Sequence, residues 1–142
     1  MNEIGESEAL GESEEEHKRI AFKFFDLVIM GKFKEGLYFF APNCITHNPY
    51  VSGGMDDLIN AMELANREMA QKYPNAEFAV KQVLSEGNMV AVHTQLINDK
   101  SRPMEGGLRQ AHLFRFDGDK IIEYWDITQQ ITPEMPNALG AF

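Results

Sequence analysis

The order of two kinds of hydrophobic pattern along the chain is the feature that most constrains its fold. The first half carries apolar residues at helical spacing, most clearly over residues 13–30 and 55–71. The second half carries four apolar segments typical of β-strands, over residues 77–85, 89–97, 108–116 and 120–129. Short Gly-containing turns join the first strand to the second and the third to the fourth, as in β-hairpins. Helices followed by an antiparallel meander predict an α+β fold.

At 142 residues the chain is long enough for one domain. We expect this domain over residues 13–131, between a flexible acidic tail (1–12) and a C-terminal tail (132–142). Ser13-Glu14-Glu15-Glu16 is a capping-box sequence and predicts the start of the first helix, which should stop near Gly31. A short second helix is expected near residues 33–40 and a brief strand at 44–48. A curved sheet wrapped around these helices would enclose a conical cavity.

Charge and composition exclude several classes of function. The formal net charge is −9 and the pI about 4.8, whereas a nucleic-acid-binding surface needs clustered Lys and Arg. No apolar stretch approaches membrane-spanning length, and we see no signal peptide, so a cytoplasmic location is expected. Cys44 is the only cysteine, so no intramolecular disulfide can form. It could act as a nucleophile, but a small buried side chain is the favoured interpretation.

Three segments stand out in order along the chain: residues 45–49 (ITHNP), 87–93 (GNMVAVH) and 112–126 (HLFRFDGDKIIEYWD). Together they resemble the SnoaL-like polyketide cyclases of the NTF2-like superfamily. The resemblance covers roughly residues 14–130. It implies a cone in which a strongly bent antiparallel sheet is closed on one face by N-terminal helices. It also implies acid/base chemistry without metal or cofactor, such as intramolecular aldol ring closure.

The resemblance assigns roles to individual residues. The family's acid/base Asp corresponds to Asp126, its His to His112, and a histidine of its early strand to His47. Family members often carry His immediately before the tryptophan of the last strand, where this chain has Tyr124. A tyrosine donates a hydrogen bond but does not titrate near neutrality.

Strand alternation gives an independent test of the two catalytic candidates. Even-numbered residues of 108–116 share one face, as do Tyr124 and Asp126 on the last strand. If His112 pairs with Tyr124 and Gln110 with Asp126, His112 and Asp126 are diagonal neighbours. A carboxylate in an apolar pocket has a raised pKa, which suits a general base, and a nearby His can bind a carbonyl oxygen as charge develops there.

Further residues are expected to contact a substrate, although each also has a structural interpretation. The expected substrate contacts are His47, Asn48, His93, Tyr124, Phe24 and Phe114. Asp126 could instead pair with Arg109 or Arg115, and His112 could be a strand histidine with satisfied hydrogen bonds. His47 could only fix its loop, and His93 could face a second subunit. His17 is expected on a helix surface, and the histidine spacings do not favour a metal site.

Two main functions therefore compete. The first is a cofactor-free cyclase or isomerase that acts next to the carbonyl of a small hydrophobic substrate, with Asp126 as base. The alternative is a non-catalytic small-molecule-binding domain, since this fold hosts many roles. A hydrolase using an Asp-activated water is a weaker third possibility. An outer sheet face carrying Trp125, Ile121 and Ile127 further predicts a homodimer through the sheet.

Overall fold

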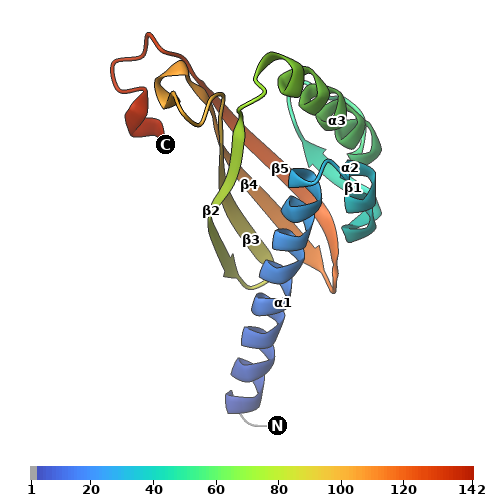
Figure 1. Ribbon diagram of the computed structural model, residues 1–142. Coiled ribbons are helices and arrows are strands. Elements are labelled where there is room, and N and C mark those ends of the chain that lie inside the picture. The colour runs from blue at the N-terminus through green and yellow to red at the C-terminus, as the bar shows by residue number, and fades with distance from the viewer. Residues whose placement is uncertain (1–2) are drawn as a thin grey trace.

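The computed structural model describes residues 3–142 and has an α+β architecture, as expected (Figure 1). Its helices are α1 (Glu3–Ile29), α2 (Phe33–Gly36) and α3 (Met55–Lys72). Its strands are β1 (Phe40–His47), β2 (Glu77–Glu86), β3 (Met89–Ile97), β4 (Gly107–Asp117) and β5 (Lys120–Ile131). Three-residue 3-10 turns lie at Leu37–Phe39, Pro103–Glu105 and Leu139–Ala141.

The five strands form one open, curved sheet in the order β1-β5-β4-β3-β2. Strands β2 to β5 are an antiparallel meander, as predicted, whereas β1 pairs in parallel with β5 at one edge. Irregular pairing between Val80 and Gln82 of β2, and opposite Arg115 and Phe116 of β4, interrupts the ladder. Such bulges bend and twist a strand, which helps the sheet to curve around its helices.

The helices cover the concave face of the sheet, which we call the inner face. Helix α1 packs against β2 and β3, and α3 packs against β1 (Figure 1). Helix α1 ends as predicted near Gly31, whose φ of 76° favours glycine. The N–H of Lys32 donates to Leu27 O and that of Gly31 to Val28 O, which is the Schellman arrangement. These two hydrogen bonds satisfy carbonyl groups at the end of α1 and terminate the helix there.

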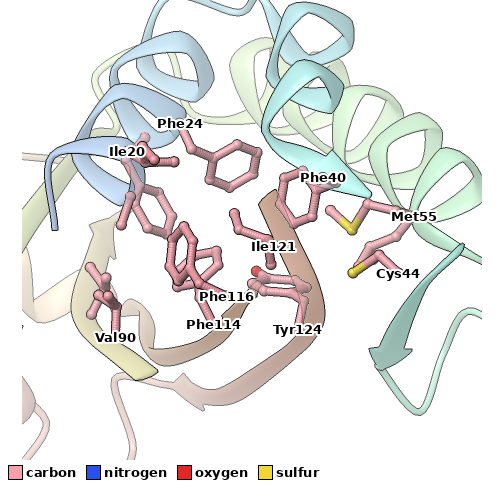
Figure 2. Close-up of a cluster of buried hydrophobic side chains, with 14 of the residues drawn as sticks. Ile20, Phe24, Phe40, Cys44, Met55, Val90, Phe114, Phe116, Ile121 and Tyr124 are labelled. Atoms are coloured by element: carbon pink, nitrogen blue, oxygen red, sulfur yellow. The ribbon is translucent and has the colours of Figure 1, made fainter. Parts of the chain in front are cut away.

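Aromatic side chains fill the space between α1 and the sheet. Phe24, Phe114 and Tyr124 have no exposed surface, and Phe25 and Phe116 have almost none (Figure 2). The ring of Phe24 makes edge contacts with Phe25, Phe40 and Phe114 at centroid distances of 5.2 to 6.1 Å. A closely packed aromatic cluster of this kind fixes the position of α1 on the sheet.

Two element boundaries differ from the sequence-based predictions. Helix α1 begins at Glu3 and not at Ser13, so residues 3–12 belong to it. Glu, Ala and Leu are strong helix formers, and they allow the helix to continue past the capping-box sequence and past Gly11. The predicted second helix is a four-residue turn, and β1 begins at Phe40 instead of Cys44. Pairing with β5 extends this strand.

Candidate functional site

Asp126 lies on the inner face directly opposite His112, because β4 and β5 pair in a register two residues away from the predicted one. The structure pairs His112 with Asp126, Phe114 with Tyr124 and Gln110 with Thr128. The turn has two residues, because Asp117 pairs with Lys120, and this shifts the register by one residue from the predicted pairing. A bulge at Ile122 of β5 shifts it by one more residue. The shift is even in total, so the predicted shared face of His112 and Asp126 is confirmed.

Asn48, just beyond the end of β1, holds the carboxylate of Asp126. Its Nδ2 donates to Oδ1 of Asp126 at 3.0 Å and to Oδ2 at 2.8 Å. The Oδ1 of Asn48 accepts a hydrogen bond from the N–H of Tyr50 at 2.8 Å, which fixes the amide. Asn48 was expected to contact the substrate, and its observed partners are Asp126 and the N–H of Tyr50. The carboxylate is therefore oriented by a neutral donor.

The electrostatic environment of Asp126 differs from that of an ordinary surface acid. Burial raises the pKa of Asp126, and the hydrogen bonds from Asn48 and from its own backbone oppose this only in part. Neither arginine considered as a partner reaches it, since Arg115 pairs with Glu123 and Arg109 bonds Gln129. Among the side chains that the structure describes, those of residue 11 and residues 13–142, none forms an ion pair with Asp126. A half-buried carboxylate without a cation suits a general base.

His112 lies in a chain of hydrogen bonds that crosses three strands and runs from the buried Tyr124 to the exposed Thr128. Its Nδ1 is 2.7 Å from the Tyr124 hydroxyl and its Nε2 is 2.9 Å from Thr94 Oγ1. The Thr94 hydroxyl donates to Gln110 Oε1 at 3.2 Å, and Gln110 Nε2 donates to Thr128 Oγ1 at 3.2 Å. His112, Thr94 and Tyr124 are buried. Both ring nitrogens of His112 are therefore satisfied within the protein.

The direction of this chain determines which nitrogen of His112 carries the proton. Because the Thr94 hydroxyl donates to Gln110, it must accept from Nε2–H of His112, and Nδ1 must accept from Tyr124 O–H. Burial lowers the pKa of His112 to about 3, so the ring is neutral. Burial also raises the pKa of Tyr124 well above its ordinary value, so the phenol stays protonated. Every donor in the chain then points from Tyr124 toward Thr128.

An open cavity of about 570 Å³ lies between the end of α1, helix α3 and one end of the sheet. Its apolar lining includes Phe33, Met62, Met69, Leu96 and Leu108, with Gln110 on the sheet side. His112 and Asp126 do not line it. They lie further along the inner face, where the pair His112–Asp126 is next to Gln110–Thr128.

Three expected substrate contacts belong to the core instead. Phe24, Phe114 and Tyr124 are fully buried in the aromatic cluster and do not line the cavity (Figure 2). The alternation pattern correctly placed Phe114 and Tyr124 on the inner face but could not distinguish the packed part of that face from the hollow part. Gln110, which does line the cavity, was not among the expected contacts. Its shared face with His112 was the signal that could have identified it.

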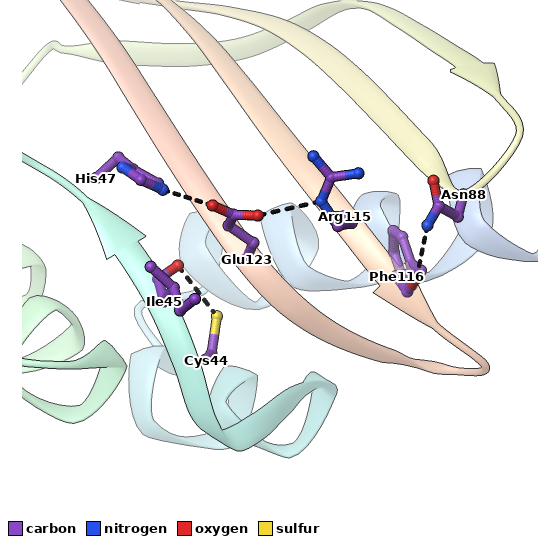
Figure 3. A network of polar contacts seen from close by, with 7 residues as sticks. All are labelled: Cys44, Ile45, His47, Asn88, Arg115, Phe116 and Glu123. Atoms are coloured by element: carbon purple, nitrogen blue, oxygen red, sulfur yellow. Dashed lines mark hydrogen bonds and ion pairs between the residues drawn. The ribbon is translucent and has the colours of Figure 1, made fainter.

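His47 and His93 lie on the opposite, convex face of the sheet, which we call the outer face. His47 pairs in register with Trp125, stacks on its ring at 4.7 Å, and has Nε2 2.7 Å from Glu123 Oε2. Arg115 Nε donates to the other oxygen of Glu123 at 3.1 Å (Figure 3). His93 pairs in register with Ala111, one residue away from the inner-face His112. The sheet therefore separates both histidines from Asp126.

The structure also shows where His17 and Cys44 lie. His17 is buried and not on a helix surface, because its ring stacks on Phe116 at 4.2 Å and its Nε2 donates to Gly118 O at 2.9 Å. Cys44 is buried as expected, and burial raises the pKa of its thiol to about 11.

In the described part of the chain no three His, Cys, Asp or Glu side chains are placed to hold a metal ion. No helix among residues 3–142 is long and apolar enough to cross a membrane.

Comparisons with solved structures show that the fold is shared with NTF2-like proteins. AclR of Streptomyces galilaeus, a proposed hydroxylase, is 15% identical with a TM-score of 0.65, over 82% of this chain and 91% of that one. A proposed SnoaL-like polyketide cyclase from Jannaschia is 16% identical with a TM-score of 0.60, over 82% and 88%. An NTF2-like protein of unknown function from Cytophaga hutchinsonii is 16% identical with a TM-score of 0.57, over 79% and 89%.

The family follows from a comparison of the sequence with family models. A search of curated proteins finds no significant match. The model of the SnoaL-like domain matches residues 21–124, from the last third of α1 into β5, and ends two residues before Asp126. This match spans well over half of the chain and agrees with the fold and with the three sequence segments described above. The chain therefore belongs to the family of SnoaL-like domains.

Proposed function

We propose that this protein is a cofactor-free enzyme that removes a proton next to a carbonyl group of a small hydrophobic substrate, as in aldol cyclisation or isomerisation. The observation that carries the proposal is the state of Asp126. Its carboxylate is half-buried, its pKa is raised by burial, and it is oriented by Asn48 without a cation. In the proposed step Asp126 takes the proton from carbon, and the electron pair of the broken C–H bond moves toward the carbonyl oxygen.

The surroundings of Asp126 suit a base that takes up a proton and then releases it in each catalytic cycle. Asn48 donates hydrogen bonds that stabilise the charged carboxylate, whereas burial destabilises it, so the two effects partly cancel. A carboxylate whose pKa is raised accepts a proton more readily than an exposed one. Asn48 would also keep the carboxylate in one orientation while the substrate changes.

We assign His112 a positioning role in place of the direct catalytic role that the sequence resemblance implied. Its ring is neutral and both nitrogens have protein partners, so it has no free donor for a substrate. Through Tyr124 and Thr94 it links the floor of the site across β3, β4 and β5. Loss of this link would disturb the inner face from which Asp126 projects.

The alternative is a domain that binds a small molecule without changing it. One observation favours this alternative: Asp126 and His112 both have protein partners, and neither lines the cavity. The solved structures with this fold carry names as different as hydroxylase and polyketide cyclase, so the fold alone does not choose. A test must therefore measure proton removal itself and not only binding.

Hydrogen–deuterium exchange at carbon tests the proposal without knowledge of the natural substrate. The protein is incubated in D₂O with a panel of hydrophobic cyclic and aryl ketones, and loss of the proton signal next to the carbonyl is followed by NMR. We expect faster exchange with the unaltered protein for at least one ketone, and a reduction of about 100-fold or more with Asp126→Asn. Asp119→Asn removes the same charge from the exposed β4–β5 turn and is the matched control.

Two results would contradict the proposal. If no ketone of the panel exchanges faster than in buffer, the binding alternative replaces it. If exchange occurs and Asp126→Asn retains it, the site is catalytic but Asp126 is not its base. Circular dichroism and thermal unfolding of each variant establish that a loss of exchange does not reflect loss of the fold.

A further inference from the structure

The charges of helix α1 are divided along its length. Residues 3–16 contain seven Glu and no Lys or Arg, and the cations Lys18 and Arg19 follow almost directly. The helix begins well outside the body of the domain, since Figure 1 shows α1 projecting past the β2–β3 and β4–β5 turns. At about 1.5 Å per residue, residues 3–12 extend over about 15 Å. We call residues 3–12 the acidic arm.

A hydrogen bond at Glu14 shows where α1 meets the body of the domain. The N–H of Gly87, in the β2–β3 turn, donates to Glu14 Oε1 at 3.4 Å. The acidic arm lies before this contact. Its glutamates four residues apart, such as Glu8 and Glu12, repel each other on a helix. Cations supplied along the arm by another molecule would therefore stabilise it as a helix.

A hollow of about 400 Å³, which we call the basic hollow, lies between α1 and the edge strand β2. Lys18 and Arg19 of α1 and Lys81 of β2 line it, together with Glu15. Lys18 pairs with Glu15 at 2.8 Å and Arg19 with Glu16, but surface pairs between neighbouring helix positions contribute little. Lys81 is exposed and forms no ion pair among the side chains that the structure describes. These cations are therefore available to carboxylates, in a protein whose net charge is −9.

The basic hollow also has an apolar lining. Val80 and Val83 of β2 contribute to it, as does Phe22 of α1, which is 46% exposed. A good partner would cover these apolar groups and bring carboxylates to the cations beside them. The acidic arm carries both kinds of group, since Ile4 and Leu10 stand among its glutamates.

We propose that the acidic arm of one copy of the protein docks in the basic hollow of a second copy, and that the reciprocal contact forms at the same time. Two identical helices with an acidic first part and a basic following part match in charge when they run antiparallel, which is a two-fold symmetric arrangement. Centred near Glu15, it places residues 3–12 of one copy along residues 18–27 of the other. The contact is separate from a dimer through the outer face, because α1 covers the inner face, and it does not depend on Asp126.

A pair of charge-reversed variants tests the inference. The arm variant carries Glu8→Lys and Glu12→Lys, and the hollow variant carries Arg19→Glu and Lys81→Glu. Each variant alone brings like charges together in the proposed dimer, whereas a mixture restores opposite charges at both contacts. An association through the outer face is the same in both variants, so mixing them does not change it.

The measurement is fluorescence-detected sedimentation of the arm variant, labelled at its C-terminus, in about 50 mM salt. We expect the unlabelled hollow variant to increase its sedimentation coefficient at concentrations at least about tenfold lower than the unlabelled arm variant does. In about 500 mM salt the increase should disappear, because exposed charges are screened. The unaltered protein should likewise associate less in the higher salt.

A matched control makes the same charge change on α3, with Arg67→Glu and Lys72→Glu at exposed positions. It should bind the arm variant less tightly than the hollow variant does, because its own basic hollow still repels the reversed arm. The inference is overturned if the two charge-reversed variants, folded as judged by circular dichroism, sediment in a mixture as they do separately. It is equally overturned if the α3 control binds the arm variant as tightly as the hollow variant does.

Discussion

Lowering the pH should destabilise the fold through His112, because its imidazole stays neutral when folded and binds a proton once the chain unfolds. Burial lowers the pKa of His112 from 6.5 to about 3. A group with a depressed folded pKa adds stability above its unfolded pKa, and this contribution is lost as the pH falls. The loss should therefore begin near pH 6.5 and continue toward pH 3.

The expected magnitude follows from proton linkage. Between these two pH values unfolding takes up about one proton at His112, which costs about 1.4 kcal/mol of stability per pH unit. From pH 6.5 to about pH 4.5 the loss is about 3 kcal/mol. For a domain of this size a urea m-value of about 2 kcal/mol per molar converts this into a midpoint lower by about 1.5 M.

The assay is urea unfolding of the unaltered protein and of His112→Gln, at about pH 7 and about pH 4.5. The comparison isolates the contribution of His112 to the pH dependence of stability. Glutamine keeps hydrogen-bonding groups near Tyr124 and Thr94 but does not titrate. Other groups, such as Asp126 with its raised pKa, contribute to both proteins and cancel in the comparison. The free energy of unfolding of the unaltered protein, relative to that of His112→Gln, should fall by about 3 kcal/mol between about pH 7 and about pH 4.5. An advantage that is equal at the two pH values would refute the neutral, buried assignment of His112.

Two further predictions follow from the contacts of the sheet. Tyr124→Phe leaves Nδ1 of His112 buried without a donor and should cost about 1–3 kcal/mol in urea unfolding, whereas Tyr38→Phe, on an exposed ring, should cost less than about 0.5 kcal/mol. Equal effects would contradict the directed hydrogen-bond chain. We also expect a homodimer through the outer face, where Ile127 and Leu84 are exposed. Sedimentation should show Ile127→Lys weakening it at least tenfold while Leu64→Lys on α3 does not, and a micromolar monomer of the unaltered protein would exclude it.

Local signals in the sequence predicted most of the fold. Apolar residues at helical spacing predicted α3 nearly to its ends, and Gly31 correctly predicted the end of α1. The hairpin sequence around Gly118, whose φ is 57°, correctly predicted that β4 and β5 are neighbours. Alternation placed His112 and Asp126 on one face, since any even register shift preserves it.

The errors had three separate causes. A bulge in β5 at Ile122 moves Ile121 to the inner face, where it is fully buried, although alternation with Trp125 placed it outside. His47 resembled a family histidine, but its register with Trp125 puts it on the outer face. Helix α1 extends well before Ser13, because a capping-box sequence does not end a run of strong helix formers.

The sequence by itself determined the class of fold, the family resemblance, and which residues of each strand share a face. These properties depend on local geometry, because turns, helix spacing and the two-residue period of a strand are set by neighbouring residues. Only the tertiary structure decided that Asn48 donates hydrogen bonds to Asp126 and that Gln110 lines the cavity. It also decided that His112 is neutral and that both of its ring nitrogens have hydrogen-bond partners. Those properties depend on which strands meet, in which register, and on how much water their contact excludes, and no local pattern encodes them.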